Sequence, residues 1–278
     1  DRHMVTKISR NVITNCAMAI SRSAILLYII YPLAACSLFS VQVQSTSADK
    51  HFPSNTNISQ KNSTNSNGAL RLLTLNVAHG RKDAINQVFV SKKAIENNLL
   101  EIANLLNREN ADIVALQEAD GPSGWSGNFD HVETIAKQAG YPWYYHAAHA
   151  SSWLFSYGTA ILSRWPVSET IEHTFTPSPP TLNKGFLLNR IIWKPDHNTN
   201  GEVFIDIVSV HLDFSRKKVR EQQITEIANA LAVRENPMII LGDFNSDWFS
   251  DESVVKELAE KSQLKVFEPH ASNLHTYV

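Results

Sequence analysis

The segment Met238–Asn245 reads Met-Ile-Ile-Leu-Gly-Asp-Phe-Asn, and it gives the clearest indication of the fold. Its four leading apolar residues form a run of strand length, which is typical of a strand buried on both faces of a sheet. Asp243 follows where such a strand ends. In α/β sheets, ligands bind beyond the carboxyl ends of the strands, so Asp243 is a first candidate for a functional residue.

The same arrangement occurs three more times upstream, where apolar runs end on Asn76, Glu118 and His211. A polar residue after a strand is usually a turn former, and each of these positions alone has that simpler interpretation. Four recurrences of carboxylate, carboxamide and imidazole groups make coincidence a weaker explanation. If the strands share sheet edges, we expect the four side chains to converge on one pocket.

From Leu70 onward, apolar runs of strand length alternate with segments of helical period. We expect strands at Leu70–Leu75, Ile113–Leu116, Ala160–Leu162, Leu187–Trp193, Val203–Val210 and Met238–Leu241. We expect helices at Ser91–Asn107, Asp130–Ala139 and Ser215–Arg234, with Gly140 as a helix stop. The sequence therefore predicts an α/β domain over residues 70–278.

Composition limits the possible classes of protein. The chain has 278 residues, which is long enough for one domain. Its formal net charge is −2, so it has no general basic field for bulk nucleic-acid binding. Its two cysteines, Cys16 and Cys36, both precede the expected domain. This position excludes a disulfide framework or a cysteine-based metal site inside that domain.

The N-terminal region has the pattern of a secretory signal. Ala24–Ala35 is an uncharged, mostly apolar run preceded by Arg22, and it is too short to span a bilayer, which needs about 20 apolar residues. Leu33–Cys36 resembles the lipobox of bacterial lipoproteins, which predicts a signal peptide over 1–35 and a lipidated Cys36. The alternative is that this run is a buried helix of the domain.

Residues 36–69 are rich in Ser, Asn, Thr and Gln, so we expect a disordered polar tether there. The prediction places the protein in the bacterial cell envelope, attached to the membrane through Cys36. By analogy with other lipoproteins, Ser37 after the cysteine favours the outer membrane over the inner one.

Five motifs together resemble those of the endonuclease/exonuclease/phosphatase superfamily. They are Leu75–Val77, Leu116–Glu118, Tyr157–Arg164, Ser209–Asp213 and Leu241–Asn245, and their order and rough spacing match too. The resemblance covers about residues 70–278. It implies a two-sheet α/β sandwich with helices on the outer faces, and metal-dependent hydrolysis of phosphate esters.

The resemblance also implies a role for each strand-end residue. Glu118 would be the main ligand of Mg²⁺, or of Mn²⁺, with Asn76 beside it, since oxygen ligands suit such ions. Asp243 would orient or deprotonate the attacking water. His211 and Asn245 would donate hydrogen bonds to phosphoryl oxygens, and Asn76 would lie near the phosphate as well.

Three further features have more than one interpretation. Arg190 is either a phosphate-binding neighbour of the site or an exposed arginine at the end of a strand. The cations of Ser215–Arg220 either attract phosphate or form a solvated helix face. The aromatic stretch Tyr141–Tyr157 either packs in the core, stacks on bases or enters a lipid interface.

One motif of the superfamily does not occur in this sequence. Its members close with an Asp-His segment, whereas Ser272–Val278 resembles the Thr-Tyr stretch that comes shortly before it. We expect His270 and His275 to be ordinary surface histidines. We also expect the printed polypeptide to have little activity and a version with the Asp-His segment to be active.

With His211 at this strand end, the sequence resembles the branch of the superfamily that contains sphingomyelinases, inositol-phosphate phosphatases and secreted DNases. The leading hypothesis is therefore a phosphodiesterase acting on phospholipid-like or nucleic-acid substrates at a bacterial membrane. The alternatives are a phosphomonoesterase for a soluble compound and a lipoprotein binding module without catalysis. No protein partner is implied.

Overall fold

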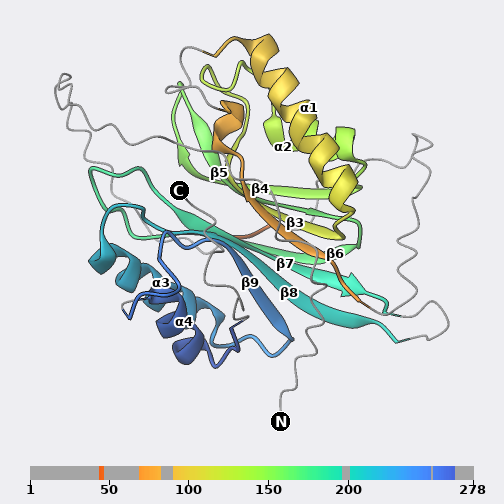
Figure 1. Ribbon diagram of the computed structural model, residues 1–278. Helices are drawn as coiled ribbons and strands as arrows, with labels where there is room; N and C mark the ends of the chain where they lie inside the picture. Colours follow the sequence, from red (N-terminus) through yellow and green to blue (C-terminus); the bar gives the residue numbers. More distant parts are fainter. Residues whose placement is uncertain (1–43, 47–68, 83–89, 196–200, 252, 267–278) are drawn as a thin grey trace.

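The computed structural model describes residues 44–46, 69–82, 90–195, 201–251 and 253–266. Two β-sheets pack face to face, one with the strand order β1-β6-β7-β8-β9 and the other with the order β2-β3-β5-β4. Figure 1 shows α1 and α2 over the outer face of the second sheet and α3 and α4 over the outer face of the first. The predicted two-sheet α/β sandwich is confirmed.

The strands are β1 Gln44–Thr46, β2 Leu72–Asn76, β3 Ile113–Asp120, β4 Trp143–Ser151, β5 Ser156–Ser163, β6 Val167–Thr174, β7 Gly185–Trp193, β8 Val203–His211 and β9 Met238–Asp243. The helices are α1 Lys92–Glu109, α2 His131–Ala139, α3 Lys217–Leu231 and α4 Val254–Ser262, with a 3₁₀ turn, η1, at Ala78–Gly80.

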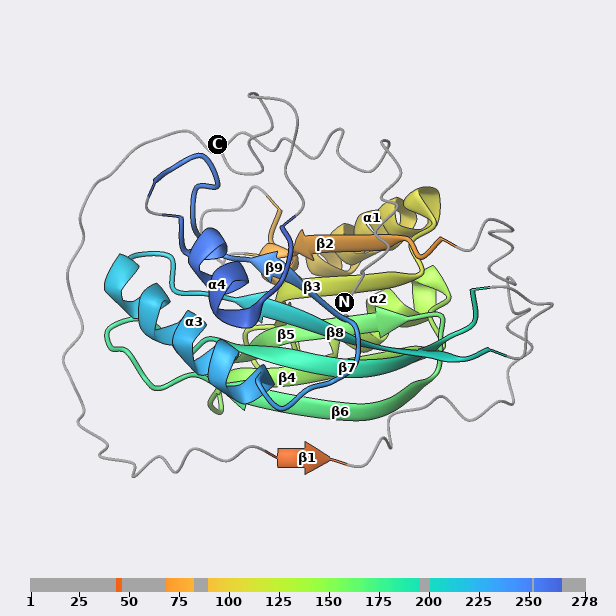
Figure 2. The ribbon, with the colours of Figure 1, turned by 90° about the horizontal axis from the view of Figure 1, so that it is seen from below.

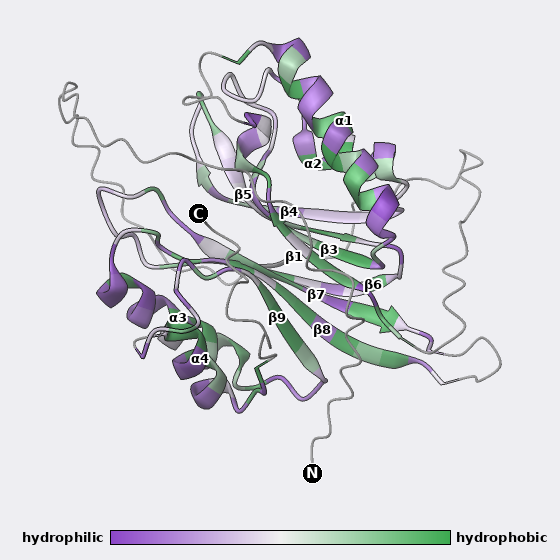
Figure 3. Cartoon of the chain, viewed as in Figure 1, coloured by the Kyte–Doolittle hydropathy of each residue, from purple (hydrophilic) through white to green (hydrophobic). Residues whose placement is uncertain are grey.

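Three apolar cores hold the layers together. The core between the two sheets includes Ile161, Leu187 and Ile207. The other cores lie between each sheet and its helices, and they include Leu99 of α1 and Ile227 of α3. Figure 3 shows apolar strands between helices whose outward faces are polar. Each fully buried aliphatic side chain contributes about 1.5–3 kcal/mol, so burial explains this layered arrangement.

Local signals fix the helix ends near the predicted positions. The hydroxyl of Ser91 accepts a hydrogen bond from the amide of Ala94 and caps α1. The carboxylate of Asp130 accepts one from the amide of Glu133 and caps α2. Gly140 ends α2 in the left-handed conformation, at a φ of 71°. The stop predicted at Gly140 is thus confirmed.

The structure adds elements that the sequence did not predict. β4 falls inside the aromatic stretch, and β6 and α4 were not expected at all. β1 lies within the predicted tether and pairs antiparallel with β6; Figure 2 shows it as a short arrow beside that edge. A strand of three residues needs only backbone pairing, so the polar composition did not prevent it. The predicted signal peptide, Cys36 and both C-terminal histidines lie outside the described residues.

Two parallel strand pairs carry the predicted site residues. β2 pairs parallel with β3, and β8 pairs parallel with β9. The carboxyl ends of both strands in each pair therefore lie at the same edge of their sheet. The register places His211 beside Asp243 and Asn76 beside Gln117. Across the described ranges, no helix has both the length and the hydropathy that a bilayer span requires.

Candidate active site

The carboxyl ends of four strands meet at one edge of the sandwich. Asn76 Nδ2 donates a hydrogen bond to Asp243 Oδ2 at 3.0 Å, which joins β2 of one sheet to β9 of the other. His211 Nε2 lies 3.8 Å from Asp243 Oδ2 and 4.0 Å from Glu118 Oε1. The structure therefore brings together Asn76, Glu118, His211 and Asp243.

An irregularity in β3 aims Glu118 at this edge. The pairing of β3 with β5 shifts between Gln117 and Ala119, and Glu118 has a φ of 50°. A bulge of this kind bends a strand and redirects one side chain. The bulge explains why Glu118 faces the site although Gln117, its neighbour, is buried between the sheets.

Gln117 and Ser209 form a polar link beneath the site. Gln117 Nε2 donates to Ser209 Oγ at 3.2 Å, and Thr74 Oγ1 donates to Gln117 Oε1 at 3.2 Å. Ser209 Oγ in turn donates to the carbonyl oxygen of Leu116 at 3.3 Å. Buried polar groups with satisfied hydrogen bonds favour one arrangement of the surrounding core. This link therefore fixes β3 relative to β8.

Both oxygens of Asp243 have defined hydrogen-bond donors. Oδ2 accepts from Asn76, and Oδ1 accepts from the backbone amide of Asn245 at 3.0 Å. Asn245 Nδ2 donates to the carbonyl oxygen of Leu212 at 2.9 Å, which leaves its second amide hydrogen for another acceptor. Gly242 has a φ of 149°, and a Cβ there would overlap the carbonyl oxygen of Val210. The end of β9 therefore requires glycine at this position, where it lies against the backbone of β8.

His211 is buried and electrically neutral at pH 7. Burial lowers its pKa well below the usual value, and the positive charge of Lys184 lowers it further. Lys184 Nζ lies 3.2 Å from Nε2 and 3.3 Å from Nδ1 of the imidazole. Burial also lowers the pKa of Lys184, while the carboxylates of Glu118 and Asp243 oppose this effect. A neutral imidazole keeps one N–H to donate to a substrate oxygen.

The donor set fits a hard divalent ion. Glu118 and Asp243 present carboxylate oxygens whose side chains are 21% and 27% exposed, so solvent reaches both. Asn76 adds a carboxamide oxygen at the same edge. Within the described residues there is no cluster of three or more His, Cys, Asp or Glu side chains arranged for a metal. Mg²⁺ is often held by only one or two carboxylates, with water and substrate oxygens completing its coordination.

The structure does not bring Arg190 to this group. Its Nε lies 3.2 Å from Asp206 Oδ1 and its Nη1 lies 3.0 Å from Glu169 Oε2. In the register of β7 with β8, Arg190 pairs with Asp206, whereas Gly185 pairs with His211. Five residues of extended strand span about 17 Å. Arg190 is therefore a member of a distant ion-pair network, and its assignment to phosphate binding is corrected.

The cations of Ser215–Arg220 are partly engaged in holding a loop. Arg216 donates to the carbonyl oxygens of Ser178 and Pro179 and to the hydroxyl of Thr181. Thr181 and Arg216 both contact Asp213. Burial raises the pKa of Asp213, but hydrogen bonds from the Thr181 hydroxyl, from the backbone amides of Arg216 and Ser215 and from the Ser215 hydroxyl outweigh it and lower the pKa to about 2. Arg216 thus binds groups of the protein itself.

The aromatic stretch divides between core and surface. Tyr141, Tyr145 and Tyr157 are buried, and the hydroxyl of Tyr141 donates to the carbonyl oxygen of Ala111 at 2.9 Å. Trp153, in the hairpin between β4 and β5, is 90% exposed. Core packing is therefore the role of these tyrosines, while Trp153 is available to a partner or a surface.

Three residues at the site were missed by the sequence analysis: Lys184, His79 and Asp120. Lys184 precedes the glycine that begins β7, and its sequence context is that of an ordinary surface lysine. His79 lies in η1, where Gly80 signals a turn but does not reveal where the histidine points. Asp120 lies two residues after Glu118, and the bulge puts both near the edge, which the sequence pattern does not show.

A two-sheet α/β sandwich with carboxylate, amide and imidazole groups at its strand ends has the architecture of a phosphoesterase. The model of the Endonuclease/Exonuclease/phosphatase family matches residues 73–264, and this chain belongs to that family. Its members are phosphoesterases and nucleases, and they generally use divalent metal ions. A search of curated proteins found no match.

Solved structures support the fold. An endonuclease/exonuclease/phosphatase family protein from Leptotrichia buccalis is 17% identical, with a TM-score of 0.51 over 69% of this chain and 73% of that one. A functionally unknown conserved protein from Enterococcus faecalis is 15% identical, with a TM-score of 0.51 over 68% and 71%. An endonuclease/exonuclease/phosphatase from Beutenbergia cavernae is 17% identical, with a TM-score of 0.50 over 68% and 52%.

Proposed function

We propose that this protein is a Mg²⁺-dependent phosphodiesterase that acts on phospholipid-like or nucleic-acid substrates at a bacterial membrane. The observation that carries the proposal is the meeting of Asn76, Glu118, His211 and Asp243 within hydrogen-bond or near-contact distance, from two different sheets. A bound Mg²⁺ would neutralise phosphate charge and stabilise the leaving oxygen. Mn²⁺ suits the same oxygen donors.

The residues of this chain then have distinct tasks. Glu118 would hold the ion together with Asn76. Asp243 has both oxygens oriented by donors, so that its carboxylate can accept a proton from a water molecule at a fixed position. His211, held neutral by burial, would donate its N–H to a phosphoryl oxygen, and Asn245 would donate its second amide hydrogen.

Lys184 adds a buried positive charge to the same group. Its ammonium lies beside His211 and is attracted by the carboxylates of Glu118 and Asp243. A cation that is already oriented and partly desolvated stabilises negative charge more than a solvated one does. We infer that Lys184 stabilises the charge that develops on the phosphoryl group.

Exposed apolar side chains favour a phospholipid-like substrate over a nucleic acid. Trp153 and Leu154 lie in the hairpin before β5, Leu182 lies two residues before Lys184, and Phe214 lies three residues after His211. Phe249 lies in the loop after β9. Apolar and aromatic side chains on loops are typical of contacts with a lipid interface.

The test compares hydrolysis of bis(p-nitrophenyl) phosphate and p-nitrophenyl phosphate by a version of the protein with the Asp-His segment, with and without Mg²⁺. We expect Mg²⁺-dependent hydrolysis that prefers the diester, and a loss of about 100-fold in Glu118→Gln, since the metal supplies several kcal/mol of charge stabilisation. Preference for the monoester would support the phosphomonoesterase alternative. Absence of turnover in the parent, together with tight binding of phosphate esters, would support a non-catalytic binding module.

The membrane location is a separate proposal that rests on Leu33–Cys36. We propose that Cys36 is lipidated and anchors the domain in the bacterial envelope, with the outer membrane favoured. Expression of the parent and of Cys36→Ser with radiolabelled palmitate, followed by membrane fractionation, tests it. We expect label and membrane association in the parent alone. Equal labelling of both proteins would contradict the anchor.

A further inference from the structure

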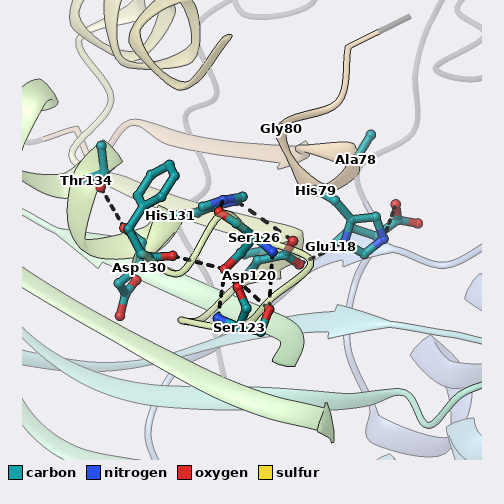
Figure 4. Close-up of polar contacts among 12 residues, drawn as sticks. Ala78, His79, Gly80, Glu118, Asp120, Ser123, Ser126, Asp130, His131 and Thr134 are labelled. Atoms are coloured by element: carbon teal, nitrogen blue, oxygen red, sulfur yellow. Dashed lines mark hydrogen bonds and ion pairs between the residues drawn. The ribbon is translucent and has the colours of Figure 1, made fainter. Parts of the chain in front are cut away.

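His79 lies between two carboxylates at the edge of the site. Its Nδ1 is 2.8 Å from Asp120 Oδ1, and its Nε2 is 3.3 Å from Glu118 Oε2. Figure 4 shows the imidazole ring between the two side chains. Nδ1 forms a hydrogen bond with Asp120, and Nε2 lies in contact with the carboxylate of Glu118.

Packing holds the ring in this orientation. His79 is 7% exposed and Asp120 is 2% exposed. The rings of Trp125 and Tyr157 contact the imidazole edge-on, with centroid distances of 5.3 Å and 4.8 Å. A side chain enclosed in this way has few alternative rotamers. The position of Nε2 relative to Glu118 is therefore set by the surrounding protein.

The backbone of η1 is specialised for this placement. Ala78, His79 and Gly80 have successive positive φ values of 45°, 58° and 69°. The left-handed conformation costs about 1–2 kcal/mol for each residue with a Cβ. Such strain persists where the surroundings fix it, and it is often found at functional sites. Asn98 Nδ2 donates to the carbonyl oxygen of Gly80 at 2.8 Å and ties the turn to α1.

Asp120 depends on His79 for its hydrogen bond. His131, the other histidine nearby, is 3.9 Å from Asp120 Oδ2, and its Nε2 faces the carbonyl oxygen of Ser126 at 2.9 Å. Burial lowers the pKa of His131, so the ring is neutral at pH 7 and its one proton is on Nε2. Within the described residues, Asp120 Oδ2 has no hydrogen-bond partner. The buried carboxylate of Asp120 therefore orients His79 strongly.

We propose that His79, oriented by Asp120, is a positioning residue that fixes the carboxylate of Glu118 for metal binding. The metal-binding part of this inference rests on the proposed function, which assigns the ion to Glu118. Groups that hold a ligand in place typically change metal affinity by about 10- to 100-fold when they are replaced. Asp120 and Glu118 are both on β3, so one strand would supply the ligand and its support.

Two substitutions separate the contacts of the two ring nitrogens. The amide nitrogen of an asparagine lies near the position of Nδ1, and that of a glutamine lies nearer the position of Nε2. His79→Asn would keep the contact with Asp120 and lose the one with Glu118, and asparagine also tolerates the positive φ. Mn²⁺ binding to the full chain, measured by titration calorimetry without substrate, is the readout. We expect affinity to fall about 10-fold or more in His79→Asn and less in His79→Gln.

Controls separate positioning from folding. His173→Asn breaks a similar histidine–carboxylate contact, in which Nε2 lies 3.2 Å from Glu226 Oε2, outside the proposed site, and we expect it to leave Mn²⁺ affinity unchanged. Urea unfolding of each variant reports stability directly. Asp120→Asn should reduce Mn²⁺ affinity in the same direction as His79→Asn. Parental affinity in both His79→Asn and Asp120→Asn would overturn the inference.

Metal-free crystal structures of the parent and of His79→Asn distinguish this inference from the proposed function. We expect the Glu118 carboxylate to leave its parental position in His79→Asn, or in His79→Gln if the first variant does not fold, while the bulge of β3 stays. A parent that binds no Mn²⁺ would overturn the metal assignment, and the two structures would still decide the positioning role. An unmoved Glu118 carboxylate would overturn it.

Discussion

Asn76 donates its side-chain hydrogen bond to Asp243 across the interface of the two sheets, over a sequence separation of 167 residues and a distance of 3.0 Å. The same side chain accepts a hydrogen bond from the amide of Ala78 at 3.0 Å. Asn76 therefore connects three features: the strand end of β2, the turn that carries His79, and the carboxylate of Asp243. Its position makes it a link between both halves of the sandwich.

Asn76→Ala should reduce activity far more than stability. The substitution removes a donor that orients Asp243 and an oxygen near the proposed ion, so we expect kcat/KM on a phosphodiester to fall about 10- to 100-fold. The lost hydrogen bonds are partly solvent-exposed and should cost about 1–2 kcal/mol of unfolding free energy. Steady-state kinetics and urea unfolding of a version with the Asp-His segment check these values. Thr225→Ala on the exposed face of α3 serves as control, and a kcat/KM within twofold of the parent would contradict the role of Asn76.

The strand ends show why part of this site was predictable. An apolar run ending on a polar residue is a local pattern, and it marked Asn76, Glu118, His211 and Asp243, whose side chains the structure brings together. Their convergence depends on parallel pairing of β2 with β3 and of β8 with β9, on the packing of the two sheets, and for Glu118 on the bulge in β3. The local pattern therefore marked the four residues, and the fold brings them together.

The remaining residues depend on geometry that no local pattern records. His79 reaches Glu118 because three successive residues adopt positive φ, and Lys184 reaches His211 because β7 pairs antiparallel with β8. Arg190 was wrongly assigned to phosphate binding because the start of β7 could not be predicted. The strand begins at Gly185, so Arg190 lies in its middle, away from the site. β4 was missed because its residues Trp143–Ser151 include alanines and histidines that do not form an apolar run.

Stability should fall when the pH is lowered from 7 to 5, because of buried histidines. Burial lowers the pKa of His149 to about 3, and it lowers the pKa of His131 and of His211 as well. Below pH 6.5 the unfolded chain binds protons that these folded histidines exclude, so the unfolding free energy decreases as pH falls. Each such histidine contributes a slope of about 1.4 kcal/mol per pH unit at most.

Urea unfolding at pH 7, 6 and 5 measures that slope, and this range avoids the titration of most carboxylates. His149 bonds to the hydroxyls of Thr159 and Thr174, so His149→Gln should be less stable than the parent at pH 7. It should also show a shallower loss of stability toward pH 5. A slope identical to the parental one would mean that His149 takes up a proton as readily in the folded protein as in the unfolded chain.

Arg234 should contribute more to stability than any surface ion pair. It donates to Asp206, which is fully buried, and to both oxygens of Glu169 at 3.0 Å and 2.9 Å. Arg234→Met would leave the Asp206 carboxylate buried with less compensation, and we expect a loss of about 3–5 kcal/mol of unfolding free energy. Urea unfolding measures it. Lys137→Met, which breaks a half-exposed pair with Glu133, is the comparison and should cost about 0.5 kcal/mol or less.

Trp153 should strengthen binding to phospholipid surfaces if the proposed substrate class is correct. The protein is prepared as Cys36→Ser, so that no lipid anchor contributes, and its binding to phosphatidylcholine vesicles is measured by sedimentation. Trp153 is 90% exposed, and burying such a side chain in the interface contributes about 1.5–3 kcal/mol. Trp153→Ala should therefore weaken vesicle binding about 10-fold or more.

Val233→Ala removes an 83% exposed apolar side chain beside Arg234, away from the site, and should bind vesicles like the parent. If both variants bind equally well, the apolar loops do not recognise lipid, and a nucleic-acid diester becomes the substrate to test next.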